Sequence, residues 1–155
     1  MNDLFEKLDV IASKCKEYGY GFIEGATEAD LEIFLARCKN DLGLTPPDQY
    51  LFFLRKFDGL VVEGVFLYST RSIEIAGDNG CSLDFVEMNV LSRELEWMNA
   101  YVFFGDSDQD VYVLDIASNS YQVRDKQAFD NVYEEFDSFL GLFEYMVDLM
   151  LDRVS

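Results

Sequence analysis

Apolar side chains recur every three or four residues near both ends of the chain, the spacing that places them on one face of an α-helix. Near the N-terminus this stripe consists of Leu4, Phe5, Leu8, Ile11, Ala12 and Cys15. From about residue 138 another stripe runs to the end of the chain and consists of Phe139, Leu140, Phe143, Val147, Met150, Leu151 and Val154. We therefore expect an amphipathic helix at the start and a long helix at the end.

Two further helices are predicted between residues 27 and 57, because their ends carry typical start and stop residues. Thr27 is a good N-cap, and Asp30 three residues later makes a variant of the capping box. The apolar stripe that follows consists of Leu31, Phe34, Leu35, Cys38 and Leu42, and Gly43 suits the left-handed position just past a helix end. We expect the next helix to begin at Pro46-Pro47. Proline is tolerated in the first turn of a helix, because the backbone N–H that it lacks would have no hydrogen-bond partner there. The stripe of this predicted helix consists of Tyr50, Phe53, Leu54 and Phe57, and Asp58-Gly59 ends it.

After residue 60 the pattern changes to that of β-strands. Residues 61–68 are rich in β-branched and aromatic side chains, which favours a strand, and residues 72–76 offer it a partner. Residues 100–105, 111–116 and 121–124 predict three more strands joined by short turns, so we expect a meander. The intervening residues 82–97 are ambiguous, although Val90, Leu91, Leu95 and Met98 suggest a helix.

The order of these elements is helices, antiparallel strands and a final helix, without the alternation of strand and helix that builds a parallel sheet. This order predicts an α+β fold with a mainly antiparallel sheet, helices packed on one face and a long C-terminal helix. The chain has 155 residues, half of them hydrophobic, which is enough to bury a core. We expect one domain spanning residues 1–155.

The charge of the chain is strongly one-sided. Thirty acidic and twelve basic residues give a net charge of −18 at pH 7. Such a surface repels nucleic-acid phosphates and anionic lipids and attracts a basic protein, although solubility alone is an equally open explanation. The N-terminus is acidic and no apolar run approaches the roughly 18 residues of a membrane span, so we expect a cytoplasmic protein without direct nucleic-acid or membrane partners.

The sequence offers little for catalysis or for metal binding. Its three cysteines are odd in number and form no CxxC pair, and Cys15 and Cys38 lie on apolar helix faces, which suggests free thiols in a reducing compartment. Histidine is absent, and with it the commonest zinc ligand and the usual base of a serine or cysteine nucleophile. We expect no catalytic residue, no cofactor and no metal site.

Acidic residues form several short groups that invite a chemical interpretation. Asp106, Asp108 and Asp110 have the alternate spacing of a calcium loop, but Val111 stands where the turn glycine belongs, so a solvated hairpin turn is the better interpretation. Glu94 with Glu96, and Glu134 with Glu135, are pairs of carboxylates like those of glycoside hydrolases, but their spacing in the sequence does not place them across a cleft. In a chain this acidic such pairs arise by chance.

Trp97 is the only tryptophan and lies between Glu96 and Met98, two residues after Leu95. Tryptophan is favoured in protein interfaces, where polar residues surround it, but it is also common in cores. The core interpretation is favoured here, and the interface interpretation stays open because an aromatic among acids would suit a basic partner.

Residues 42–59, LGLTPPDQYLFFLRKFDG, resemble the SMI1/KNR4 family of the SUKH superfamily. The family pattern has prolines, an aromatic, an apolar pair and an Asn-Gly-like stop, matched here by Pro46, Pro47, Tyr50, Phe53, Leu54 and Asp58-Gly59. Thr45 replaces the usual leucine and Asp58 the usual asparagine. Residues 64–69, 104–115 and 136–140 are similar to later family blocks, so the resemblance covers most of the chain from Gly25 onward.

The resemblance implies a scaffold that binds other proteins. Many bacterial members are immunity proteins that neutralise toxin domains, whereas fungal members are regulatory scaffolds. Together with the negative charge, the resemblance favours a non-enzymatic immunity protein that neutralises a basic, nuclease-type toxin domain. The alternative is an intracellular regulatory scaffold. We expect the partner to contact Asp78, Glu94, Glu96, Trp97, Asp106, Asp108 and Asp110.

Overall fold

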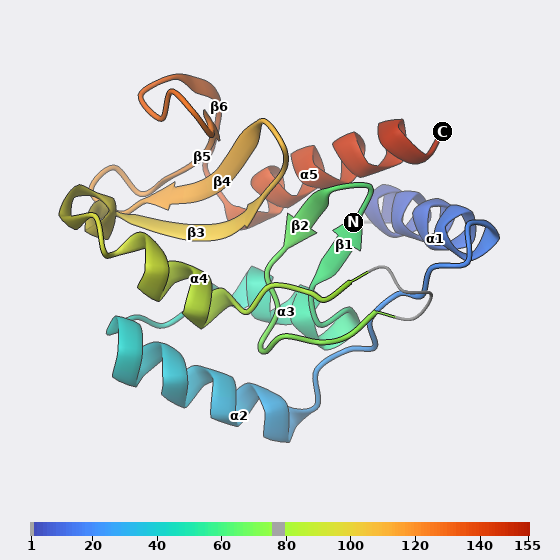
Figure 1. The fold of residues 1–155 in the computed structure, drawn as a ribbon, viewed down its shortest axis with the longest axis horizontal. Helices are drawn as coiled ribbons and strands as arrows, with labels where there is room; N and C mark the ends of the chain where they lie inside the picture. Colours follow the sequence, from blue (N-terminus) through green and yellow to red (C-terminus); the bar gives the residue numbers. More distant parts are fainter. Residues whose placement is uncertain (1, 76–79) are drawn as a thin grey trace.

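A computed structural model of the protein describes residues 2–75 and 80–155 and has an α+β architecture (Figure 1). The helical segments are α1 (Asn2–Glu17), α2 (Glu28–Arg37), the π-helix η1 (Cys38–Leu42), α3 (Asp48–Lys56), α4 (Phe85–Ser92), the 3₁₀-helix η2 (Glu96–Ala100) and α5 (Phe139–Val154). The strands are β1 (Leu60–Val62), β2 (Val65–Leu67), β3 (Tyr101–Asp106), β4 (Asp110–Asp115), β5 (Ser120–Asp125) and β6 (Val132–Phe136). They form one antiparallel sheet in the order β1-β2-β3-β4-β5-β6.

The helix ends follow the local rules that the sequence suggested. Thr27 accepts a hydrogen bond from the Asp30 N–H while the Asp30 carboxylate accepts one from the Thr27 N–H, so the capping box is complete. Gly43 ends η1 with a φ of 65°. Pro47 is the N-cap of α3, and Ser138 caps α5 by accepting from the Gly141 N–H. The long C-terminal helix is confirmed.

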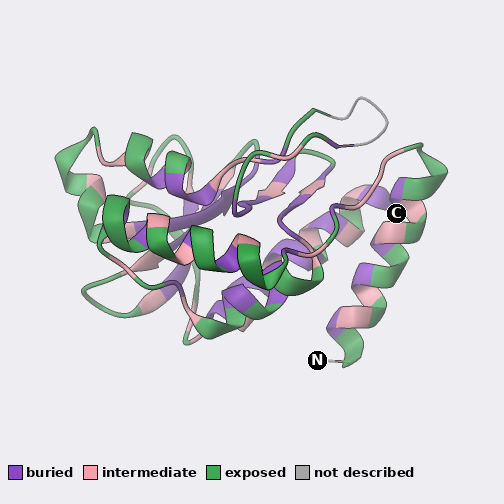
Figure 2. Ribbon diagram, turned by 90° about the horizontal axis from the view of Figure 1, so that it is seen from below, coloured by how far each residue is buried: buried purple, intermediate pink, exposed green. Residues whose placement is uncertain are grey.

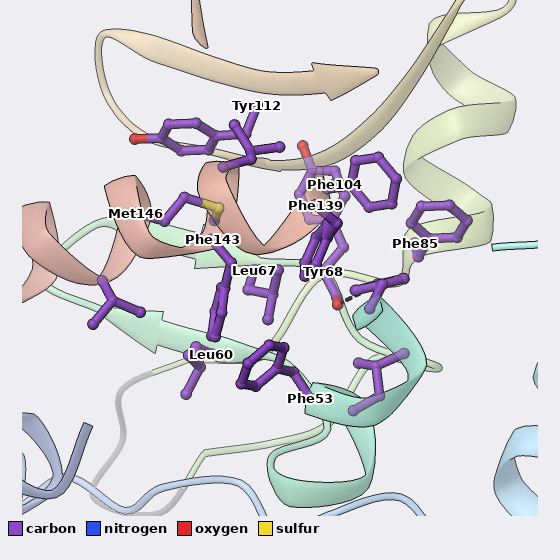
Figure 3. Packing of buried hydrophobic residues seen from close by; sticks show 14 of the residues in the cluster. Phe53, Leu60, Leu67, Tyr68, Phe85, Phe104, Tyr112, Phe139, Phe143 and Met146 are labelled. Carbon is purple, nitrogen blue, oxygen red and sulfur yellow. Dashed lines mark hydrogen bonds between the residues drawn. The ribbon is translucent and has the colours of Figure 1, made fainter. Parts of the chain in front are cut away.

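The core lies between the sheet and the helices α3 and α5, with α1 packed beside α5 (Figures 1 and 2). In Figure 3 the side chains of Phe139, Phe143 and Met146 from α5 point toward residues of α3 and of the β1–β2 hairpin. The rings of Phe53 and Phe143 are 4.3 Å apart between centroids. Cys15 and Cys38 are buried free thiols in this apolar interior, as expected from their helix faces.

Three strand predictions need correction. Residues 61–68 are not one strand, because Glu63 and Gly64 adopt positive φ and turn the chain back into the β1–β2 hairpin. Residues 72–75 form no strand and contribute only the isolated bridge between Glu74 and Cys81, while residue 76 lies outside the described residues. The strand β6 was not expected at all. The meander of β3, β4 and β5 is confirmed.

Buried Asn89 of α4 completes the edge of β3 where β2 has ended. Its amide donates to the Phe103 carbonyl at 2.8 Å, and its side-chain oxygen accepts from the Phe103 N–H at 2.8 Å. The same amide donates to the Phe85 carbonyl at 2.9 Å. The side chain therefore replaces a neighbouring strand and fixes α4 to the sheet. Among the described residues, no helix has the length and apolar character that a bilayer-spanning segment requires.

Replacing Asn89 with alanine would leave the buried N–H and C=O of Phe103 without partners. We expect Asn89→Ala to lower the free energy of unfolding by about 3 kcal/mol, because each unpaired buried group costs roughly 1–3 kcal/mol. Urea denaturation followed by circular dichroism measures the change. The control is Asn99→Ala at an exposed position of η2, which should stay within about 0.5 kcal/mol of the unmodified protein. Equal effects of the two substitutions would contradict the role given to Asn89.

Candidate functional site

Exposed apolar side chains occur at the end of α4 and along the segment that links it to β3. Val90, Leu91, Leu95 and Trp97 are 44%, 51%, 53% and 52% exposed. The exposure of Trp97 contradicts the expectation that this tryptophan belongs to the core. We call the surface formed by Val90, Leu91, Glu94, Leu95, Glu96 and Trp97 the α4–η2 surface. Isolated exposed apolar residues are ordinary, whereas contiguous apolar patches mark interaction sites, so this surface is a candidate site.

The α4–η2 surface is held by polar contacts at both ends of α4. At the N-terminal end, Asp84 caps the helix and pairs with Arg37 of α2 at 2.8 Å. At the C-terminal end, the guanidinium of Arg93 donates to the carbonyl of Leu42 at 2.8 Å. Together with Asn89, these contacts tie α4 to α2, to η1 and to the sheet. The exposed side chains therefore project from a fixed backbone, which reduces the entropy that a partner must remove on binding.

Trp97 is supported on its inner side by an aromatic stack. Its ring meets the edge of Phe129 at a centroid distance of 5.1 Å, and Phe129 in turn meets Tyr101 at 4.8 Å. The guanidinium of buried Arg124 lies 4.8 Å from the ring centres of both Tyr101 and Phe129. The indole is thus positioned by packing while half of its surface faces solvent. A concavity of about 570 Å³ lies beside it and is lined by Trp97 and residues 127–131.

Carboxylates border these apolar residues. Glu87, Glu94 and Glu96 are exposed, and neither Glu94 nor Glu96 makes an ion pair with any part of the chain that the structure describes. Their negative charge is therefore available to a partner. An aromatic and aliphatic centre with a polar rim is the usual arrangement of a protein interface.

The remaining predicted contact residues do not join this surface. Because η2 leads into the first residue of β3, while Asp106 is its last, the β3–β4 turn lies roughly 16 Å away along the strand. Asp106 is buried, accepts a hydrogen bond from the Tyr68 hydroxyl and lies 3.5 Å from the Lys126 ammonium. The expectation of a solvated turn is therefore wrong for Asp106. Asp78 lies outside the described residues.

The other two acids of that turn are in different environments. The guanidinium of Arg153 bonds Asp108 at 2.6 Å and lowers the pKa of its carboxyl. Partial burial, followed by the nearby charges of Asp108 and Asp125, raises the pKa of the Asp110 carboxyl. No group of three or more potential metal ligands occurs among residues 2–75 and 80–155.

A cleft of about 370 Å³ lies between residues 22–30 and residues 71–75, and no sequence pattern predicted it. Acidic residues line it together with Arg71, but two of them serve the fold. Asp30 belongs to the capping box, and the buried carboxylate of Asp58 accepts hydrogen bonds from the N–H and hydroxyl of Thr70. Burial raises the pKa of the Asp58 carboxyl in spite of these bonds. The cleft pairs segments far apart in sequence, which explains why periodicity did not reveal it.

The model of the SMI1 / KNR4 family (SUKH-1) matches residues 25–144. This match confirms the resemblance that the sequence suggested from Gly25 onward. A search of curated proteins finds no match.

The single tryptophan allows the charge around the α4–η2 surface to be measured. We expect caesium to quench Trp97 fluorescence more strongly, and iodide more weakly, relative to the quenching of free tryptophan by each ion at the same ionic strength, because the neighbouring glutamates attract the cation and repel the anion. Glu94→Lys combined with Glu96→Lys should reverse this preference. The control combines Glu6→Lys with Asp9→Lys, exposed acids of α1, and changes the net charge equally. A reversal in that control as well would assign the effect to net charge instead of the local surface.

Proposed function

Since this chain belongs to the SMI1 / KNR4 family (SUKH-1), we propose that it is a non-enzymatic immunity protein that binds and neutralises a basic, nuclease-type bacterial toxin domain in the cytoplasm. That residues 1–155 act as one binding domain is part of the proposal. The observation that carries it is the exposed Trp97, preceded by the exposed Glu94 and Glu96, in the segment that follows the anchored helix α4. The proposed activity requires no cofactor and no metal.

The α4–η2 surface has the two components that such binding needs. Trp97 and Leu95, each about half exposed, supply apolar area that a partner removes from water. Tryptophan dominates the binding energy of many interfaces when polar contacts exclude solvent around it. Glu94 and Glu96, together with the net charge of −18, attract a cationic partner and speed its encounter with this face.

Neutralisation would follow from occupation of the toxin's basic residues. A nuclease binds phosphates through lysine and arginine side chains, and carboxylates satisfy the same groups. The α4–η2 surface is the primary contact in this proposal. Asp78, Asp108 and Asp110 remain proposed secondary contacts, and Asp106 would act only through its position in the turn.

The first experiment is capture of the partner from source-cell extract on the purified protein, followed by washes at low and then high salt. We expect a basic toxin domain that elutes as the salt concentration rises, because screening weakens exposed charge pairs. Retention of a neutral regulatory protein through the high-salt wash would instead favour the intracellular scaffold.

The contribution of Trp97 can then be measured with the captured partner. We expect Trp97→Ala to weaken binding by about 2 kcal/mol, or roughly thirtyfold in Kd, because the central aromatic contact is lost. Ile33→Ala is the control, because Ile33 is 64% exposed on α2 and is not one of the residues of the α4–η2 surface, and should leave Kd unchanged. Isothermal titration calorimetry gives both values. Unchanged affinity in the Trp97 variant would reject the α4–η2 surface as the contact.

The charge component is tested separately. We expect Glu94→Gln combined with Glu96→Gln to slow association and to reduce the dependence of Kd on salt, because rim charges act mainly on the encounter rate. Surface plasmon resonance at two salt concentrations measures both quantities. If the salt dependence of Kd were the same with and without these carboxylates, electrostatic attraction would have to come from another surface.

A further inference from the structure

The outer edge of β6 is open. β6 is the last strand in the sheet order, so within the described parts of the chain no strand pairs with its outer side. Residues 132–135 are all exposed. Hydrogen-bonded and non-bonded pairs alternate along an antiparallel ladder, so every second residue of β6 turns its N–H and C=O away from β5. An exposed edge of this kind is a template for another strand.

Hydrogen bonds to β5 already order the side chains of this edge. The Tyr133 hydroxyl donates to the Asp125 carboxylate, and the amide of Gln122 donates to Glu135 at 3.1 Å. Glu134 and Glu135 are consecutive, so their side chains lie on opposite faces of the sheet. The edge therefore presents a carboxylate on each face beside a backbone of fixed conformation.

The segment of chain that contains β6 carries charge of a single sign, whereas the neighbouring β5 holds the buried Arg124 opposite Val132 and is followed by Lys126. No lysine or arginine occurs from Gln127 to Asp152, while seven acids do: Asp130, Glu134, Glu135, Asp137, Glu144, Asp148 and Asp152. A second copy of β6 pairing antiparallel at this edge would set glutamates against glutamates, and like charges directly opposite each other are destabilising. The acids thus disfavour self-pairing and favour a strand that carries positive charge.

We propose that the open edge of β6 binds an extended, lysine- or arginine-bearing segment of another protein by strand addition. Backbone hydrogen bonds supply the register and the edge carboxylates select the charge, as in other complexes formed by β-augmentation. This surface is different from the α4–η2 surface. Strand addition at β6 and the proposed neutralisation of a toxin can therefore each fail without the other.

The test uses the full-length protein and a nine-residue, end-blocked peptide in which lysine alternates with threonine and valine. Two further peptides of the same sequence carry N-methyl groups on alternate residues. In one peptide the methyl groups block one edge of the extended chain, and in the other they block the opposite edge. We expect the unmodified peptide and one methylated peptide to bind, and the other to bind at least tenfold more weakly, because only one edge bonds to β6. Amide hydrogen exchange should slow in residues 132–136 on binding.

Matched protein variants test the charge selection. Glu134→Lys combined with Glu135→Lys should weaken binding of the unmodified peptide at least tenfold, whereas Glu6→Lys combined with Asp9→Lys should leave it within about twofold. Circular dichroism establishes that each variant is folded.

Several results would overturn the proposal. Equal binding of all three peptides would mean charge attraction without strand addition. Slowed exchange at residues 90–97 instead of 132–136 would place the peptide on the α4–η2 surface. Concentration-dependent dimerisation with protection of β6 in the absence of peptide, measured by analytical ultracentrifugation, would identify a second copy as the occupant.

Discussion

The ring of Tyr50 in α3 contacts aromatic side chains from four other elements of the fold. Its centroid lies 6.4 Å from Phe34 of α2, 5.3 Å from Phe85 of α4, 5.2 Å from Phe104 of β3 and 5.3 Å from Phe139 of α5. The hydroxyl donates to the Tyr68 carbonyl at 2.6 Å, just beyond the end of β2. Because this buried polar group is satisfied, the ring can occupy the centre of an apolar core without a desolvation cost. The positions of α4 and β3, and with them the α4–η2 surface, depend on this packing.

The acidic residues fall into two classes, those that are bonded within the fold and those that are exposed to solvent. Asp58, Asp84 and Asp106 are bound to Thr70, Arg37 and Tyr68 within the fold. Glu94, Glu96, Glu134 and Glu135 are exposed. Only a subset of the carboxylates is therefore available for contact with another protein, and these lie on two different surfaces. The α4–η2 surface offers apolar area with a charged rim, and the β6 edge offers backbone hydrogen bonds with selecting charges.

The helices were predictable because their signals are local. Thr27, Gly43 and Ser138 cap helices through contacts with residues at most four or five positions away. The apolar face of a helix such as α5 can be recognised from the spacing of its apolar residues. β6 was missed because four of its five residues are exposed and its burial does not alternate. The β1–β2 hairpin was missed because its turn uses a positive φ at Glu63, a conformation that sequence rules assign to other residue types. Of the candidate site, Glu94, Glu96 and Trp97 stay predicted partner contacts, whereas the favoured interpretation of Trp97 as a core residue is wrong, because its side chain is exposed.

The sequence by itself determined α1, α2, α3 and α5, the meander, the family and the sign of the charge, because each depends on neighbours along the chain or on composition. Only the tertiary structure decided which side chains face solvent. Trp97 is exposed because the Phe129 stack occupies its inner side, Asp106 is buried because Tyr68 lies beside it, and the β6 edge is open because the sheet order ends there. These outcomes depend on residues more than twenty positions apart in the sequence or on the order of the strands, and side-chain periodicity carries no information about either.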